Sequence, residues 1–321
     1  MGGLRSLPVN STYPPGEQMA RPICMGAAGW SRIGGNEKER PVPVSTIDRQ
    51  FVRIAEGPVH LRRLAGPGRP LLLFHPSPNS SRGMVPLMQA LRAAGSDADM
   101  IAVDMLGNGD SPPPAPDVPD IGYFADAMLR LMDAMGIARA DLYGAHTGAR
   151  IACELAARHP GRVGRVLFQG ISDFDEATRA GRLESYAPAM EPDVYGRQFL
   201  WAFHFVRDQS LHAPYFLRDP EHRLTNRAVP DAAGLHAAAM DVLKSLTVYH
   251  KPYRAAFAYP TSARIGAVKA PALFIRSATH PPHIASAAET LAAAMADARV
   301  APTDGSPEQE AAAILPFLRG G

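Results

Sequence analysis

Five short apolar runs constrain the fold of this chain more than any other feature of its sequence. Each run is too short for a helix and is bounded by Gly, Pro or Asp. Such runs are typical of strands that are buried on both faces of a parallel sheet. They are Leu71–Phe74, Met100–Val103, Leu142–Gly144, Val166–Phe168 and Ala272–Ile275.

Amphipathic segments separate these strands. Residues 84–93, 123–135 and 149–158 carry apolar side chains at helical spacing. Ahead of them, two alternating stretches, 51–54 and 59–64, predict a β-hairpin. Strands that alternate with helices in this way predict an α/β fold with a doubly wound, mostly parallel sheet.

Composition divides the chain into segments. Residues 1–45 contain many prolines and glycines, which predicts a flexible N-terminal extension. The α/β core is predicted at residues 46–171 and 263–321. Between these, residues 172–262 are rich in aromatic side chains on helical segments, which we interpret as a helical lid, with additional core packing as the simpler reading.

The overall composition excludes several functional classes. The chain has 321 residues, 46% of them hydrophobic, and a net charge of +2, too low for a nucleic-acid partner. Cys24 and Cys153 cannot build a disulfide framework or a thiolate metal site. No apolar run approaches the ~18 residues of a membrane helix. We expect a cytoplasmic protein without a membrane partner or a cofactor, acting on a small molecule; a homo-oligomer stays open.

The loops that follow the strands carry the side chains that could take part in binding or catalysis. Ligands of an open parallel sheet bind at the carboxyl ends of its strands. Four such ends carry polar or histidine-containing loops: residues 75–80, 104–111, 144–148 and 276–280. The site is therefore expected where these four loops meet.

The sequence Gly144-Ala145-His146-Thr147-Gly148 resembles the nucleophile elbow of the α/β-hydrolase family. In that turn the central residue has a strained backbone, and the flanking glycines let strand and helix pack closely. The loops at residues 75–78 and 104–111 resemble those that precede the elbow. The resemblance covers Thr46 to Leu318 and implies hydrolysis of an ester, a lactone or a carbon–carbon bond.

The chain departs from this family at each position of the catalytic triad. His146 stands where the family has Ser, Cys or Asp. His280 lies near the position of the family's acid, and the loop of the family's histidine offers Asp304 instead. No Ser-His-Asp set can be assembled, so the resemblance implies an atypical hydrolase of non-serine type.

His146 is the predicted catalytic residue, as a general base or a nucleophile. The amino end of the following helix disfavours a charged imidazolium. Asp304 is predicted to orient the ring. The backbone N–H groups of Thr147 and Ser77 are predicted to form an oxyanion hole.

Two alternatives concern His146 itself. His146, His280 and Asp304 form a two-histidine, one-carboxylate set that divalent metals favour, with His283 able to replace His280. Alternatively, His146 fills the elbow of a site whose catalysis has been lost.

Other residues receive weaker predictions. His75, His280 and Trp201 are possible pocket residues, and the His75 ring is expected chiefly to support the oxyanion loop. Asp104 is expected to tie its loop to backbone, and Cys153 to lie in the core. Two further functions also stay open: a cofactor-independent lyase, decarboxylase or oxygenase, and a non-catalytic binder of small molecules.

Overall fold

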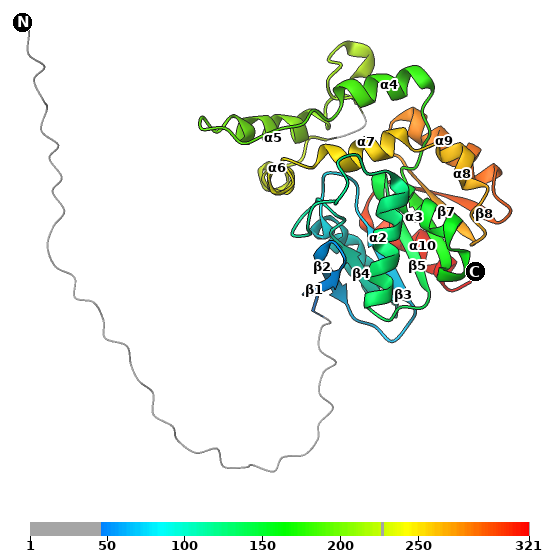
Figure 1. Cartoon of the computed structure of the whole chain (residues 1–321). Helices are drawn as coiled ribbons and strands as arrows, with labels where there is room; N and C mark the ends of the chain where they lie inside the picture. Colours follow the sequence, from blue (N-terminus) through cyan, green and yellow to red (C-terminus); the bar gives the residue numbers. More distant parts are fainter. Residues whose placement is uncertain (1–45, 226–227, 321) are drawn as a thin grey trace, which may run out of the picture. The chain divides into compact units, whose positions relative to one another are not determined.

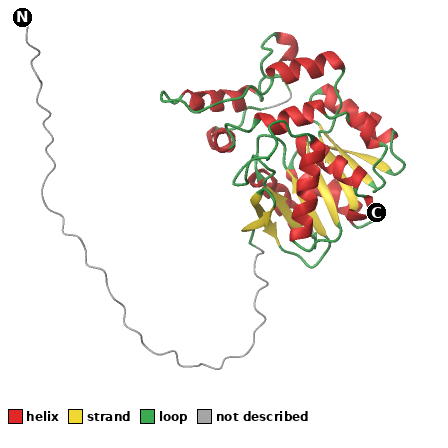
Figure 2. Cartoon of the chain, in the orientation of Figure 1, coloured by secondary structure: helices red, strands yellow, loops and turns green. Residues whose placement is uncertain are grey.

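An eight-stranded sheet with helices on both faces forms the centre of the molecule (Figure 1 and Figure 2). The computed structural model describes residues 46–225 and 228–320, so the predicted N-terminal extension at 1–45 lies outside the described residues. The strand order is β1-β2-β4-β3-β5-β6-β7-β8. The strands are β1 (Asp48–Ile54), β2 (Gly57–Leu64), β3 (Pro70–Phe74), β4 (Asp99–Val103), β5 (Ala140–Ala145), β6 (Val163–Gln169), β7 (Ala272–Ser277) and β8 (Ala298–Thr303).

The pairing of the strands confirms the predicted α/β sheet. β1 and β2 form the expected antiparallel hairpin, with Val52 opposite Val59. β2 also pairs antiparallel with β4, and the remaining neighbours pair in parallel. Because side chains alternate across a strand, β3 sends Leu72 to one core and Leu73 to the other. Burial on both faces explains its unbroken apolar sequence.

Helices cover the two faces of the sheet. The core on one face includes apolar side chains of α2, α3 and α9, and the core on the other includes those of α1 and α10. All three predicted helical segments are present, within two residues at each end. The bounds are α1 (Val85–Ala93), α2 (Ile121–Ala134), α3 (Thr147–Arg158), α9 (Pro282–Ala293) and α10 (Pro307–Leu318).

A helical insertion separates β6 from β7. It contains α4 (Glu176–Ser185), α5 (Arg197–Asp208), α6 (Ala232–Lys244) and α7 (His250–Ala258), and the predicted boundary at 262 falls inside α8 (Thr261–Ile265). Figure 1 shows α7 beside the end of the sheet where α3 begins. Several of its aromatic rings, including Phe205 and Tyr249, pack into a separate small core, so part of the aromatic content is core as the simpler reading held.

None of the described helices combines the length and the hydropathy that crossing a bilayer requires.

Candidate active site

The turn between β5 and α3 has the geometry of a nucleophile elbow. His146 occupies it with φ 48° and ψ −101°, and among the described residues it alone has a positive φ without being glycine. A Cβ on Gly144 would lie 2.4 Å from the carbonyl oxygen of Gly148, and one on Gly148 would lie 2.3 Å from that of Phe74. The predicted reason for both glycines, close packing of strand and helix, is therefore confirmed.

The His146 ring lies against the end of the neighbouring strand β6. A Cβ on Gly170 would lie 2.5 Å from Cε1 of His146, so the ring occupies the space that glycine leaves. The His146 backbone N–H donates to the carbonyl oxygen of Gln169 at 2.8 Å. The ring of His280, which follows β7, lies 5.6 Å away at 72° to the His146 ring. The structure thus brings these two predicted histidines together.

His146 lines a cavity of about 360 Å³ between the strand ends and the insertion. This volume lies near the lower end of the range for small-molecule sites, roughly 300–1,000 Å³. Ser77 and Thr147, the predicted oxyanion-hole residues, line the same cavity and are both buried. The Ser77 hydroxyl has no hydrogen-bond partner among the described residues. Both residues predicted to supply these donors therefore line the cavity that His146 lines.

The His75 ring holds the loop that carries Ser77 through two hydrogen bonds to backbone groups. Its Nε2 accepts from the backbone N–H of Met105 at 3.1 Å, so its Nδ1 carries the proton and donates to the carbonyl oxygen of Pro76 at 2.9 Å. Complete burial lowers the pKa of His75, which favours this neutral ring. The expected supporting role is confirmed. Because the ring is fully buried and does not line the cavity, its assignment as a possible pocket residue was wrong.

Two arginines that the sequence analysis missed also line the cavity. Arg150, one helical turn after His146, donates to the carbonyl oxygens of His146 at 3.2 Å and Ser172 at 2.7 Å. Arg182 on α4 lies over the Phe174 ring, with 4.6 Å between the guanidinium carbon and the ring centroid. The i+4 spacing of Arg150 from His146, on an otherwise apolar helix face, was a readable signal. No sequence signal pointed to Arg182, because its position at the cavity depends on how α4 packs over the strand ends.

The sequence matches the family model described as alpha/beta hydrolase fold over residues 69–291, more than half of the chain. The chain belongs to this family. One curated relative, 2-hydroxymuconate semialdehyde hydrolase from Pseudomonas sp. strain CF600, is 34% identical over 106 residues. That match covers 33% of this chain and 38% of the relative, so it spans less than half of the relative's length.

Solved structures of other family members resemble this α/β hydrolase over most of its length. The enol-lactonase from Burkholderia xenovorans LB400 gives a TM-score of 0.60 at 21% identity, covering 84% of this chain and 99% of that one. Epoxide hydrolase A from Mycobacterium thermoresistibile gives 0.62 at 22% identity, covering 86% and 99%. At these identities the likeness shows the fold alone.

Asp304 does not serve this α/β hydrolase as predicted. Its carboxylate is exposed and accepts from the backbone N–H and the hydroxyl of Ser306, at 2.7 and 2.6 Å, and these bonds lower the pKa of Asp304. Asp304 does not line the cavity that His146 lines, and its carboxylate is engaged by Ser306. The prediction that it orients the catalytic ring is corrected: Asp304 stabilises the turn before α10.

The alternative of a metal held by His146, His280 and Asp304 also fails, because the Asp304 carboxylate is exposed and hydrogen-bonded to Ser306. Among the described residues, one three-residue set places its ligand atoms within 4.8 Å of one another, and it consists of His60, Asp104 and Asp110. An exposed Asp304 that bonds to Ser306 cannot complete the predicted set. His283, considered as a substitute for His280, does line the cavity, whereas the buried His280 does not, so the prediction of His280 as a pocket residue was wrong. Burial and, to a smaller extent, the Arg182 charge lower the pKa of His283.

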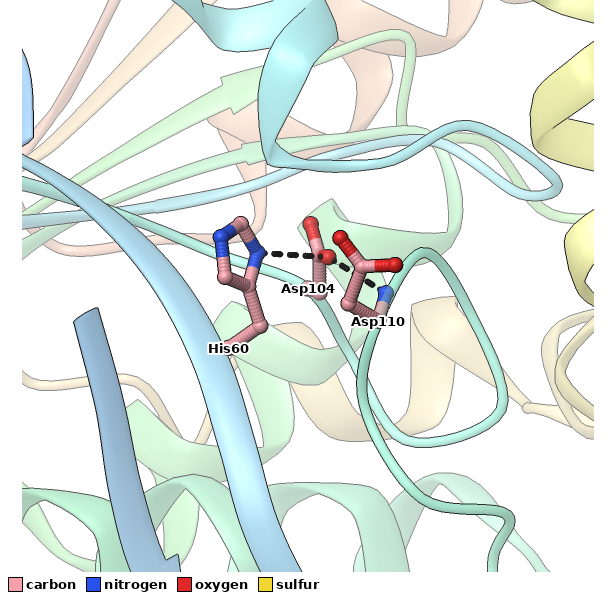
Figure 3. Close-up of side chains that lie close together, drawn as sticks. All are labelled: His60, Asp104 and Asp110. Carbon is pink, nitrogen blue, oxygen red and sulfur yellow. Dashed lines mark hydrogen bonds and ion pairs between the residues drawn. The ribbon is translucent and has the colours of Figure 1, made fainter. Parts of the chain in front are cut away.

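The cluster of His60, Asp104 and Asp110 is a hydrogen-bonded tie and not a metal site (Figure 3). Nδ1 of His60 donates to Asp104 at 2.8 Å, and Nε2 accepts from Arg49. Asp104 also accepts from the backbone N–H of Asp110 at 2.8 Å. Asp110 forms ion pairs with Arg49 and Lys244. Since these groups already occupy the ligand atoms, the expected role of Asp104 in holding its loop is confirmed.

Trp201 lies away from the cavity. Its ring stacks on Phe205, 5.0 Å between centroids, and borders a separate surface depression on α5. Its prediction as a pocket residue was therefore wrong, because α5 turns this face away from His146. Cys153 is fully buried, as expected, and burial raises the pKa of its thiol to about 12.

Proposed function

We propose that this α/β hydrolase cleaves small carbonyl compounds, namely esters, lactones or carbon–carbon bonds, with His146 as the reacting side chain. The observation that supports this most strongly is the backbone of His146, whose φ of 48° keeps a bulky ring at the elbow beside the cavity. Such strain costs of the order of 1–3 kcal/mol and persists mainly at functional sites. An inert position would accommodate glycine at less cost.

The chemistry requires a neutral imidazole and a site for negative charge. His146 precedes the first turn of α3, where the positive end of the helix dipole disfavours a second positive charge. As a base, the ring would take a proton from water while the water oxygen attacks the carbonyl carbon. The oxyanion that forms would accept hydrogen bonds from the backbone N–H groups of Thr147 and Ser77. Its collapse would break the bond to the leaving group, which would take the proton back from the His146 ring.

As a nucleophile, the His146 ring would attack the carbonyl carbon itself. The leaving group would depart with a proton, and water would then hydrolyse the acyl-imidazole. The two roles can be distinguished by experiment, because only a nucleophilic His146 produces an acylated enzyme. The relative named 2-hydroxymuconate semialdehyde hydrolase and the neighbour described as an enol-lactonase support carbon–carbon bonds and lactones as first substrates to test.

The test is turnover of short p-nitrophenyl esters, simple lactones and 1,5-dicarbonyl compounds by the full chain. His146→Ala is expected to lose about 10²–10⁴-fold in kcat/KM. His204→Ala is the matched control, because His204 borders the α5 depression and does not line the cavity. Hydroxylamine trapping of an acylated wild-type enzyme separates nucleophile from base.

Two results would overturn the proposal. One is undiminished activity of His146→Ala on every substrate that the wild type turns over. The other is inactivation of the wild type by a serine-directed fluorophosphonate, because the label would then identify a nucleophilic serine such as Ser77, which also lines the cavity. Turnover that depends on His146 and resists the fluorophosphonate supports it.

A further inference from the structure

The cavity has a one-sided charge distribution. Its lining includes the guanidinium groups of Arg150 and Arg182 but, among the described residues, neither aspartate nor glutamate. No ion pair within the described part of the chain joins either arginine to a carboxylate. A positively charged cavity of this kind favours an anionic ligand.

The carboxylate of Asp173, which acts electrostatically on Arg150, is hydrogen-bonded to other groups. Asp173 raises the pKa of Arg150, while burial, the larger effect, lowers it to about 10, so the side chain stays charged at neutral pH. The Asp173 carboxylate accepts from Arg179 at 3.2 Å and from the backbone N–H of Ser262 at 2.8 Å. It therefore neutralises Arg179 more directly than Arg150.

The two arginines differ in how they are held. Arg150 is anchored by the carbonyl oxygens of His146 and Ser172, which leaves its Nε without a partner among the described residues. The Arg182 guanidinium donates to no described residue and lies between the rings of Phe174 and Tyr186, 4.6 and 5.4 Å from their centroids. Aromatic faces favour a cation electrostatically but leave its N–H donors unsatisfied.

We propose that Arg182 binds a carboxylate of the substrate directly, with Arg150 supplying a second positive charge beside His146. This inference rests on the proposed function and names its substrate class: a small carbonyl compound that also carries a free carboxylate. A guanidinium matches a carboxylate with two parallel N–H donors, which makes the recognition directional as well as electrostatic. The anchoring of Arg150 to the His146 backbone places its charge one helical turn from the reacting residue.

The competing interpretation is that Arg182 merely packs on aromatic rings. Binding of a matched pair of probes separates the two, since benzoate and benzamide have the same shape and differ in charge. Calorimetric titration of the wild type is expected to give at least about tenfold tighter binding of benzoate. Arg182→Gln is expected to abolish this preference, and Arg182→Lys to keep part of it.

Arg179→Gln is the matched control. Arg179 lies one turn before Arg182 on α4, carries the same charge and does not line the cavity. The preference for benzoate is expected to survive in this variant. Equal affinity of the wild type for the two probes, no detectable benzoate binding, or an unchanged preference in Arg182→Gln would each overturn the proposal.

The titration also separates this inference from the proposed function, because it measures binding without turnover. The His146→Ala variant is expected to keep the preference for benzoate. If that preference holds while His146→Ala remains fully active, the reaction mechanism fails and the anion site stands. If the preference is absent while activity depends on His146, the anion site fails alone.

Discussion

Substituting Gly170 by alanine tests directly whether the position of the His146 ring matters. Gly170 follows β6 with φ +68°, and a Cβ there would lie 2.5, 2.7 and 2.9 Å from Cε1, Nδ1 and Nε2 of His146. Ordinary van der Waals contacts begin near 3.4 Å, so the imidazole would have to retreat by about 1 Å. Gly170→Ala therefore moves the proposed reacting group without changing its chemistry.

The two expected costs have different origins. The left-handed backbone of an alanine costs about 1–2 kcal/mol of unfolding free energy, and overpacking adds about 1–3 kcal/mol. A displacement of about 1 Å at a reacting group can lower activity by about 10²-fold. Gly170→Ala should therefore lose both stability, measured by urea unfolding, and kcat/KM on the best substrate of the panel.

Gly136→Ala is the matched control. Gly136 has the same φ of +68°, but a Cβ there would meet nothing within 4 Å. It should therefore show the backbone cost of about 1–2 kcal/mol and keep its activity. If Gly170→Ala loses no more stability than Gly136→Ala and remains fully active, the His146 ring does not need the space beside Gly170, and the reasoning is refuted.

A double-mutant cycle isolates the contact between the two residues. In a His146→Ser background the smaller side chain leaves room for the new methyl group. Gly170→Ala should then cost the backbone strain alone, and the difference from its cost in the wild type is the coupling energy. Additive free energies would show that the ring and Gly170 are independent.

Three other predictions concern groups outside the proposed chemistry. Burial raises the pKa of Glu310 to about 7, well above that of a free glutamate, so the folded state binds the proton more tightly. The free energy of unfolding should therefore fall as pH rises from about 4.5 to 7, and Glu310→Gln should remove this slope in thermal unfolding. Asp104→Asn should lower the free energy of unfolding by about 2 kcal/mol, because an amide replaces the buried carboxylate that accepts from the His60 ring and from the backbone N–H groups of Ser81 and Asp110. EDTA should leave the melting temperature of the wild type unchanged. Asp304→Asn should change kcat by less than about twofold, since its exposed carboxylate bonds to Ser306; a large loss would restore the predicted pairing with His146.

The fold could be predicted because its signals are local. The unbroken apolar runs reflect burial of strands such as β3 on both faces, and that burial depends little on the rest of the chain. The elbow was equally readable, because Gly144 and Gly148 are required by contacts within a few residues or with the adjacent strand. The meeting of His146 and His280 was expected because both stand near positions that converge in the family that the sequence resembles.

The cavity wall was harder to predict because it depends on contacts over long sequence separations. Arg182 reaches the cavity through the fold of α4 over the strand ends, and Trp201 leaves it through the orientation of α5. Helical periodicity predicts neither orientation, because it identifies the apolar face of a helix but not the element against which that face packs. Asp304 was misassigned for a local reason: Ser306, two residues later, offers it a hydroxyl and a backbone N–H.

The pairing of His146 with Gly170 bears on whether the histidine is a remnant of lost catalysis. A serine, cysteine or aspartate at the elbow is smaller than an imidazole and would not need the space over Gly170. In this chain the ring occupies the space beside Gly170, the residue after β6, which has no Cβ and a left-handed backbone. The left-handed backbone of Gly170 by itself favours glycine, so the missing Cβ alone does not decide between a working histidine and a remnant. The double-mutant cycle decides, because it measures the contact between the ring and Gly170 separately from the backbone cost.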